Sequence, residues 1–175
     1  MRLVCRIGFM LRVRSAEAKD AGLILAFIRG LAEYEREPEA VVATEQDILR
    51  DGFAGEAKFR VLIAEWEGQA AGFAFYFFNY STWRGKPGLF LEDLFVQPEY
   101  RGKGIGKALL AELARIAERE NCYGMKWEVL DWNQPAIDFY EGLGAKVLRE
   151  WLPVRLEGEP MSRLAAKATG VHAGQ

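Results

Sequence analysis

The stretch LFLEDLFVQPEYRGKGIGKALLAELARIAERE, residues 89–120, decides the fold class. Its first eight residues, LFLEDLFV, are leucine, phenylalanine and valine on either side of one acidic pair, and they predict a β-strand. From Ile105 to Ile116, apolar residues recur at helical spacing and predict a helix. Three glycines lie between the two, in RGKGIG at 101–106, where they allow a tight turn whose N–H groups point at an anion. The order of strand, glycine-rich turn and helix therefore predicts a phosphate-binding turn in an α/β protein.

The patterns on either side of this stretch predict the remaining elements. The expected elements are a strand at 10–13, a helix containing the apolar positions 23–31, a short helix between Thr44 and Gly52, a hairpin of two strands at 59–66 and 70–78, a strand at 125–130, a helix capped by Asn133 and ended by Gly144, and one or two closing strands within 145–157. Strands and helices in this order predict a mixed α/β sheet with helices on its faces.

The length and composition are those of one globular domain. The chain has 175 residues, half of them hydrophobic, and a net charge of −2. We expect a single domain at 10–166, a C-terminal tail at 167–175, and an N-terminal extension at 1–9 that is either disordered or a mis-assigned start. No apolar run approaches the roughly 20 residues of a membrane-spanning helix, which favours a cytoplasmic protein without a membrane partner. The charge also excludes a broad nucleic-acid-binding surface.

Acidic residues dominate one region, and this bias favours a cationic ligand, although a solvated helix surface would look the same. Residues 33–51 contain seven acidic residues and two basic ones.

Cys5 and Cys122 are far apart, and His172 is the only histidine. Zinc sites and catalytic triads need more of these residues, so we expect no metal. Any acid–base chemistry must come from carboxylates, tyrosine or lysine.

The glycine loop does not match the two best-known nucleotide-binding motifs. A P-loop would need glycine at 101 and serine or threonine at 108, where the chain has Arg101 and Ala108. A dinucleotide-binding fingerprint would need glycine at 107, where the chain has Lys107. The remaining pattern is Arg-x-x-Gly-x-Gly after an acidic strand, and taken alone it also fits a flexible loop at a helix start.

Arg101, Gly104 and Gly106 match the coenzyme A loop, R/Q-x-x-G-x-G/A, of the GNAT superfamily of N-acetyltransferases. Together with GFAFYFFNYSTW at 72–83 and DWNQPAIDFYEGLGA at 131–145, this loop resembles the diamine (spermidine/spermine) acetyltransferase subgroup, which includes thialysine acetyltransferases. The similarity extends from residue 11 to about residue 165.

The resemblance implies a mixed, mostly antiparallel sheet of about seven strands, with helices on both faces. A bulge in the fourth strand, here residues 89–96, would splay the sheet and admit acetyl-CoA. The residues that would bind this cofactor are Leu94, Phe95, Val96, Arg101, Gly102, Lys103, Gly104, Ile105, Gly106, Lys107, Asn133, Pro135, Ala136 and Tyr140.

The chemistry requires a proton acceptor, because an alkylamine with a pKa near 10.4 is only about 0.04% neutral at pH 7. Without a base in the site, the attack of the amine on the thioester carries a penalty of about 4.6 kcal/mol. By resemblance, Glu92 binds the amine and takes its proton, and Tyr140 protonates the departing thiolate. From the residues alone, Glu92 could equally be a charged surface residue of the strand, and Tyr140 a core residue of its helix. Because nothing near Cys122 in the sequence would activate it, we expect direct attack by the amine rather than an acyl-enzyme.

The resemblance also implies that the amine contacts Glu35, Trp83, Glu92 and Asp93, with Glu128 and Trp151 at the far wall. Aromatic rings attract alkylammonium groups, although each tryptophan could equally be a core residue. Polyamine acetyltransferases of the subgroup carry an aspartate at the position of Ser81. Its absence leaves open shorter diamines, lysine-like amino acids such as thialysine, and other small amines.

We therefore expect an acetyl-CoA-dependent N-acetyltransferase of small primary amines, which the resemblance also implies to be a homodimer. Two alternatives remain open. One is a protein or peptide N-acetyltransferase, which would need a groove that accepts a peptide. The other is a non-catalytic acyl-CoA-binding module, against which the presence of both Glu92 and Tyr140 argues.

Overall fold

Five strands form one mixed sheet in the order β1-β2-β3-β4-β5. Neighbouring strands are antiparallel except β4 and β5, which are parallel. The strands are β1 Leu11–Ser15, β2 Arg60–Trp66, β3 Gln69–Ser81, β4 Lys86–Val96 and β5 Met125–Lys126. The computed structural model describes residues 10–168, and the predicted extension at 1–9, Cys5 and His172 lie outside this range. The sheet belongs to a compact unit that ends at Glu128, and a second unit begins at Val129.

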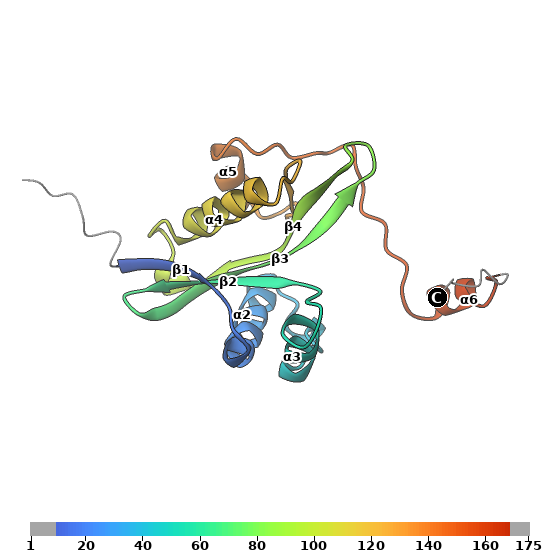
Figure 1. Cartoon of the computed structure of the whole chain (residues 1–175), viewed down its shortest axis with the longest axis horizontal. Helices are drawn as coiled ribbons and strands as arrows, with labels where there is room; N and C mark the ends of the chain where they lie inside the picture. Colours follow the sequence, from blue (N-terminus) through green and yellow to red (C-terminus); the bar gives the residue numbers. More distant parts are fainter. Residues whose placement is uncertain (1–9, 169–175) are drawn as a thin grey trace, which may run out of the picture. The chain divides into compact units, whose positions relative to one another are not determined.

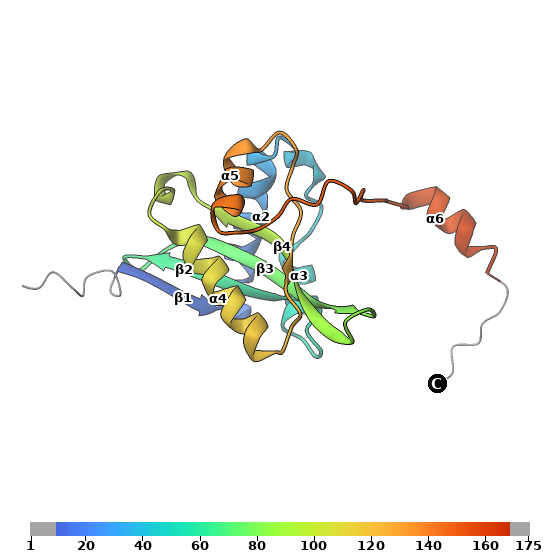
Figure 2. The same ribbon diagram turned by 90° about the horizontal axis from the view of Figure 1, so that it is seen from above.

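Helices cover both faces of this sheet, as predicted. Helices α2 (Ala21–Tyr34) and α3 (Glu45–Gly52) lie on one face, and α4 (Ile105–Arg119) lies on the other (Figures 1 and 2). Short 3-10 helices occur at Ala18–Asp20, Pro38–Ala40 and Pro98–Tyr100. Helix α3 begins with a capping box, in which Thr44 and Asp47 each bind the other's backbone N–H. Within residues 10–168, no helix is long and apolar enough to cross a membrane.

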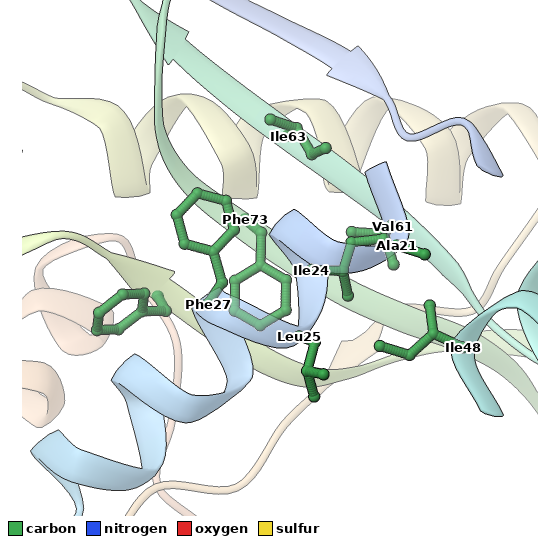
Figure 3. Packing of buried hydrophobic residues seen from close by; sticks show 9 residues of the cluster. Ala21, Ile24, Leu25, Phe27, Ile48, Val61, Ile63 and Phe73 are labelled. Atoms are coloured by element: carbon green, nitrogen blue, oxygen red, sulfur yellow. The ribbon is translucent and has the colours of Figure 1, made fainter. Parts of the chain in front are cut away.

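One hydrophobic cluster joins α2 and α3 to the sheet (Figure 3). The Phe27 ring of α2 stacks on Phe73 of β3 at 5.4 Å between centroids, and Phe95 of β4 lies 6.2 Å from Phe27. Each of these rings contributes about 1.5–3 kcal/mol by burial. Because Phe95 is part of the core, the packing of α2 fixes the end of β4.

The second unit contains α5 (Gln134–Gly142) and α6 (Gly158–Ala165). As the sequence predicts, Asn133 caps α5, and its side chain accepts a hydrogen bond from the Ala136 N–H at 3.3 Å. The chain leaves α5 through Gly144, whose φ of 89° favours glycine.

The prediction of about seven strands was too high. The strand expected at 125–130 has two residues, and the described residues contain no strand within 145–157. Strands need a neighbour for their backbone hydrogen bonds, and sequence patterns do not reveal whether one is available. Large apolar side chains of this segment stay exposed, with Leu152 at 83% and Val154 at 94%. Helix α6, which follows, was not predicted.

Strand β4 carries a bulge and a free edge. Phe75 of β3 pairs with Asp93, and Tyr76 pairs with Leu91, so Glu92 is an extra residue in β4. Strand β5 pairs with β4 only at Leu89 and Phe90. The sheet is thus open beside the second half of β4 in the part of the chain that the structure describes, in agreement with the predicted splayed strand.

The direction of the backbone groups along this edge follows from one hydrogen bond. The Gln97 N–H donates to the Ala71 carbonyl at 2.9 Å, so Gln97 and Phe95 face β3. In an antiparallel pair the intervening residues face the other way. The backbone N–H and C=O groups of Leu94 and Val96 therefore point to the free edge.

Gly72 permits the close approach of β3 to this part of β4. A Cβ atom at residue 72 would lie 2.5 Å from the Phe95 carbonyl oxygen and 3.1 Å from the Val96 Cα. We expect Gly72→Ala to force the strands apart and to lower the free energy of unfolding by about 1–3 kcal/mol, measured by urea titration. Gly124→Ala is the control, because a Cβ there meets nothing within 4 Å. Equal stability of the two variants would contradict this interpretation.

Candidate active site

The glycine loop has the geometry of an anion-binding turn. Gly102 and Gly104 have φ values of 75° and 80°, which side chains with a Cβ rarely adopt. Gly104 is the N-cap of α4, and its carbonyl accepts the Ala108 N–H at 3.0 Å. The free N–H groups of the first turn of α4 and the positive end of its dipole face the loop. The predicted residues 101–107 are all in this loop or in the first turn.

Both basic side chains of the loop lie over aromatic rings. The Arg101 guanidinium carbon is 4.7 Å from the centroid of Tyr34, and Arg101 Nε donates to the Val96 carbonyl at 3.1 Å. Lys103 Nζ lies 5.2 Å from the ring of Trp66 and 5.1 Å from that of Tyr100. The sequence analysis missed these three aromatic residues, because only the fold brings α2 and β2 to the loop.

Three acidic residues come together at the bulge of β4. Asp93 is half-buried, and burial, together with the negative charges of Glu92 and Glu35, raises the pKa of its carboxyl to about 6. Burial also raises the pKa of Glu35, which is the C-cap of α2. Glu92 is exposed. We call Glu35, Glu92 and Asp93 the acidic cluster.

The acidic cluster has charges that suit an organic cation. A bound alkylammonium would offset the cost of ionising Asp93 next to two other carboxylates. Within residues 10–168, no three histidine, cysteine, aspartate or glutamate residues are arranged to hold a metal ion.

The structure does not bring Trp83 into the acidic cluster. Trp83 is at the tip of the β3–β4 hairpin, 92% exposed, and Glu92 lies six positions further along β4 than Lys86. Six strand residues span about 20 Å, too far for contact within one chain. Glu128 is exposed, two residues after β5.

The predicted residues of the second unit lie mainly on α5. Asn133, Pro135 and Ala136 form its start, and Tyr140 is half-buried in its last turns, with its ring 5.3 Å from that of Phe139. Trp151 lies outside α5 and α6, with 71% of its surface exposed.

A small cavity of about 240 Å³ lies between α2 and the end of β4. Gly30 and Phe95 are among its lining residues, with Glu33 and Glu99 as its charged groups. Of the predicted site residues only Phe95 lines it, so this cavity is distinct from the acidic cluster and from the glycine loop.

An open strand edge, a glycine turn with the geometry of an anion-binding turn and a carboxylate at a strand bulge are features that the sequence analysis expects of an acyltransferase. The model of the Acetyltransferase (GNAT) family matches residues 24–145, and the chain belongs to this family. The resemblance, the fold class and the prediction of an N-acetyltransferase are thereby confirmed.

Thialysine N-epsilon-acetyltransferases are among the most similar curated proteins. That of Bos taurus is 41% identical over 166 residues, which cover 89% of this chain and 97% of the relative. The Spermidine/spermine N(1)-acetyltransferase-like protein 1 of Homo sapiens is 41% identical over 141 residues, which cover 77% of this chain but only 20% of that protein. Among solved structures, an integron cassette protein of V. cholerae has a TM-score of 0.73 at 28% identity and covers 89% of this chain and 98% of its own.

Proposed function

We propose that this chain transfers the acetyl group of acetyl-CoA to a small primary amine, and that the amine attacks the thioester directly. The observation that carries the proposal is the acidic cluster at the bulge of β4, next to the free edge of the same strand. The names of the thialysine and spermidine/spermine relatives support the choice of acceptor. We further propose that residues 10–166 act as one domain, since the family match spans both compact units.

The first unit offers two complementary surfaces to acetyl-CoA. Leu94 directs its N–H and C=O groups, and Val96 its N–H group, to the free edge, where they suit the amides of a pantetheine arm, while the Val96 carbonyl accepts a hydrogen bond from Arg101 Nε. The residues from Arg101 to Lys107 provide N–H groups for the diphosphate. The backbone of Phe95 faces β3, so we propose that Phe95 supports the cofactor site through its buried ring, which fixes the end of β4. In the second unit, we assign Asn133, Pro135, Ala136 and Tyr140 to the same ligand.

The acidic cluster is proposed to bind the acceptor amine. Asp93 and Glu35 are partly buried and attract the ammonium group, while the exposed Glu92 accepts a proton from it, directly or through water. Tyr140 is proposed to donate a proton to the thiolate that leaves. These groups supply the acid–base chemistry, so the transfer needs neither a nucleophilic cysteine nor a metal ion.

Glu92→Gln is expected to reduce kcat/KM by about 10- to 100-fold near pH 7, and by less near pH 9.5. The neutral amine is scarce at low pH, so loss of the proton acceptor matters most there. The measurement is kcat/KM for the acceptor from pH 6.5 to 9.5. An equal loss at every pH would assign Glu92 to substrate positioning instead.

A thiol-release assay with acetyl-CoA tests the function. Diamines, polyamines, thialysine, lysine and short peptides should be compared at equal concentration. We expect turnover with at least one small diamine or lysine-like amine, and less with peptides. Preference for peptides would favour protein acetylation, and binding of coenzyme A without turnover of any amine would favour a non-catalytic module.

We also propose that the chain forms a homodimer. The exposed apolar side chains between 147 and 164, which include Trp151, Leu152 and Val154, support an association that covers them. Light scattering should give twice the mass of one chain, 19.8 kDa, and the mass of a monomer would overturn the proposal.

A further inference from the structure

The ring of Tyr34 connects the last turn of α2 to the glycine loop. The Arg101 guanidinium carbon lies 4.7 Å from its centroid, within the range of a cation–π contact. Arg101 is the first residue of the loop, and 66 residues of chain separate it from Tyr34 in the sequence. The contact therefore fixes the loop from outside its own strand and helix.

Arg101 also binds the end of β4. Its Nε donates to the Val96 carbonyl at 3.1 Å, and its backbone N–H donates to the Pro98 carbonyl at 3.2 Å. The Val96 carbonyl points to the free edge of β4, so the Arg101 side chain binds the last carbonyl of this edge, where the loop begins, and leaves the Leu94 groups and the Val96 N–H open. One side chain thus sets the position of the strand end and of the turn together.

The end of α2 is itself held firmly. The Glu37 N–H donates to the Ala32 carbonyl at 2.9 Å and the Arg36 N–H to the Glu33 carbonyl at 3.2 Å, the bonds of a Schellman motif. Arg36 has a φ of 67° in this motif. Tyr34 therefore projects from a helix end of defined geometry, next to Glu35 of the acidic cluster.

We propose that Tyr34 is a positioning residue, which acts through Arg101 to hold the glycine loop in the conformation that binds the diphosphate of coenzyme A. The proposal rests on the proposed function for the identity of the ligand. Gly102 and Gly104 leave the loop backbone free to take other conformations, so an external contact is needed to select one. A glycine loop that is ordered before coenzyme A binds loses less conformational entropy on binding, which raises the affinity for coenzyme A.

Tyr34→Leu tests the proposal through the dissociation constant of coenzyme A, measured by calorimetry on the full chain. We expect an increase of about 3- to 20-fold, the range of a cation–π contact. Tyr34→Phe keeps the aromatic face and should stay within about threefold of the unaltered chain. In an Arg101→Met background, Tyr34→Leu should add less than about twofold, because the partner is already lost.

Leu31→Ala is the matched control for stability, because Leu31 is a partly buried residue of α2 that packs against the hydrophobic cluster. It should lower the melting temperature but leave the dissociation constant unchanged below the transition. Two results would overturn the role of Tyr34. One is that Leu31→Ala raises the dissociation constant as much as Tyr34→Leu does. The other is that Tyr34→Leu raises it as much in the Arg101→Met background as in the unaltered chain.

Hydrogen exchange separates this proposal from the proposed function, because it needs no ligand. In Tyr34→Leu, the amides of Arg101 and Ala108, which donate to the Pro98 and Gly104 carbonyls, should exchange at least about fivefold faster than in the unaltered chain, while those of β2 and β3 stay protected. Unchanged exchange of the loop would contradict the proposal even if coenzyme A binds. Faster exchange in a chain that does not bind coenzyme A would instead contradict the proposed function.

Discussion

Asp93→Asn is expected to stabilise the folded protein above pH 6 and to remove most of its acetyltransferase activity. Burial of Asp93, together with the negative charges of Glu92 and Glu35, raises the pKa of its carboxyl to about 6 from an ordinary value of 3.8. Ionised Asp93 thus costs free energy in the folded protein. The same charge is what the proposed function needs to bind an ammonium group.

The sign of the pH dependence follows from proton uptake. Between about pH 4 and pH 6 the folded state holds the Asp93 proton more tightly than the unfolded state, so this residue's contribution to stability falls as pH rises through that window. Asparagine cannot ionise. The free energy of unfolding of Asp93→Asn should therefore exceed that of the unaltered chain by about 1–2 kcal/mol at pH 8, after allowance for solvent screening. This difference should shrink towards pH 4.5.

Urea titrations at pH 8 and pH 5 measure this difference, and kcat/KM for the amine measures the cost to function. We expect a loss of about 100-fold in kcat/KM, mostly through KM for the amine. Glu92→Gln is the control for stability, because Glu92 is exposed and its replacement should change the free energy of unfolding by less than about 0.5 kcal/mol. A destabilised or fully active Asp93→Asn protein would contradict the assignment.

Tyr140→Phe is expected to lower kcat by about 100- to 1,000-fold while the affinity for coenzyme A stays within about twofold. The variant removes only the hydroxyl group that we propose as the proton donor, and general acid catalysis contributes about 10²–10⁴-fold. Helix α5 should be unaffected, because the Asn133 cap and the buried Ile137 remain. The measurements are steady-state kinetics and calorimetry with coenzyme A.

Tyr123→Phe is the matched control, since Tyr123 is also half-buried and lies outside the proposed site. It should retain kcat within about twofold. If Tyr140→Phe keeps its turnover but binds coenzyme A more weakly, Tyr140 is a binding residue, and the proton must come from another donor.

The elements with strong local signals were predicted well from the sequence. Thr44 and Asp47 form the expected capping box, Asn133 caps α5, and the glycines at 102 and 104 adopt the positive φ values that the loop requires. These features depend on neighbouring residues, so the sequence contains the information directly.

Features that depend on distant partners were not predictable in the same way. Residues 145–157 have apolar residues typical of strands, yet the structure gives them no strand, because pairing depends on a second edge. The rings under Arg101 and Lys103 come from α2, β2 and the turn before the loop, which no spacing rule connects.

The acidic pair at 92 and 93 is an intermediate case. Alternation along a strand predicts that Glu92 and Asp93 point to opposite faces, and the sequence analysis favoured Glu92 by resemblance. The bulge lies at Glu92, which is exposed, while Asp93 is half-buried, and its carboxyl is affected by the charges of Glu92 and Glu35. The raised pKa of Asp93 arises from this packing and has no local signal in the sequence.

The most direct test of the central claim is a crystal structure of the full chain with coenzyme A. We predict that the pantetheine arm lies along the free edge of β4, hydrogen-bonded to the backbone of Leu94 and to the Val96 N–H, with the diphosphate on the N–H groups of 102–106. A ligand bound elsewhere, or an edge of β4 covered by another strand of the same chain, would contradict the account.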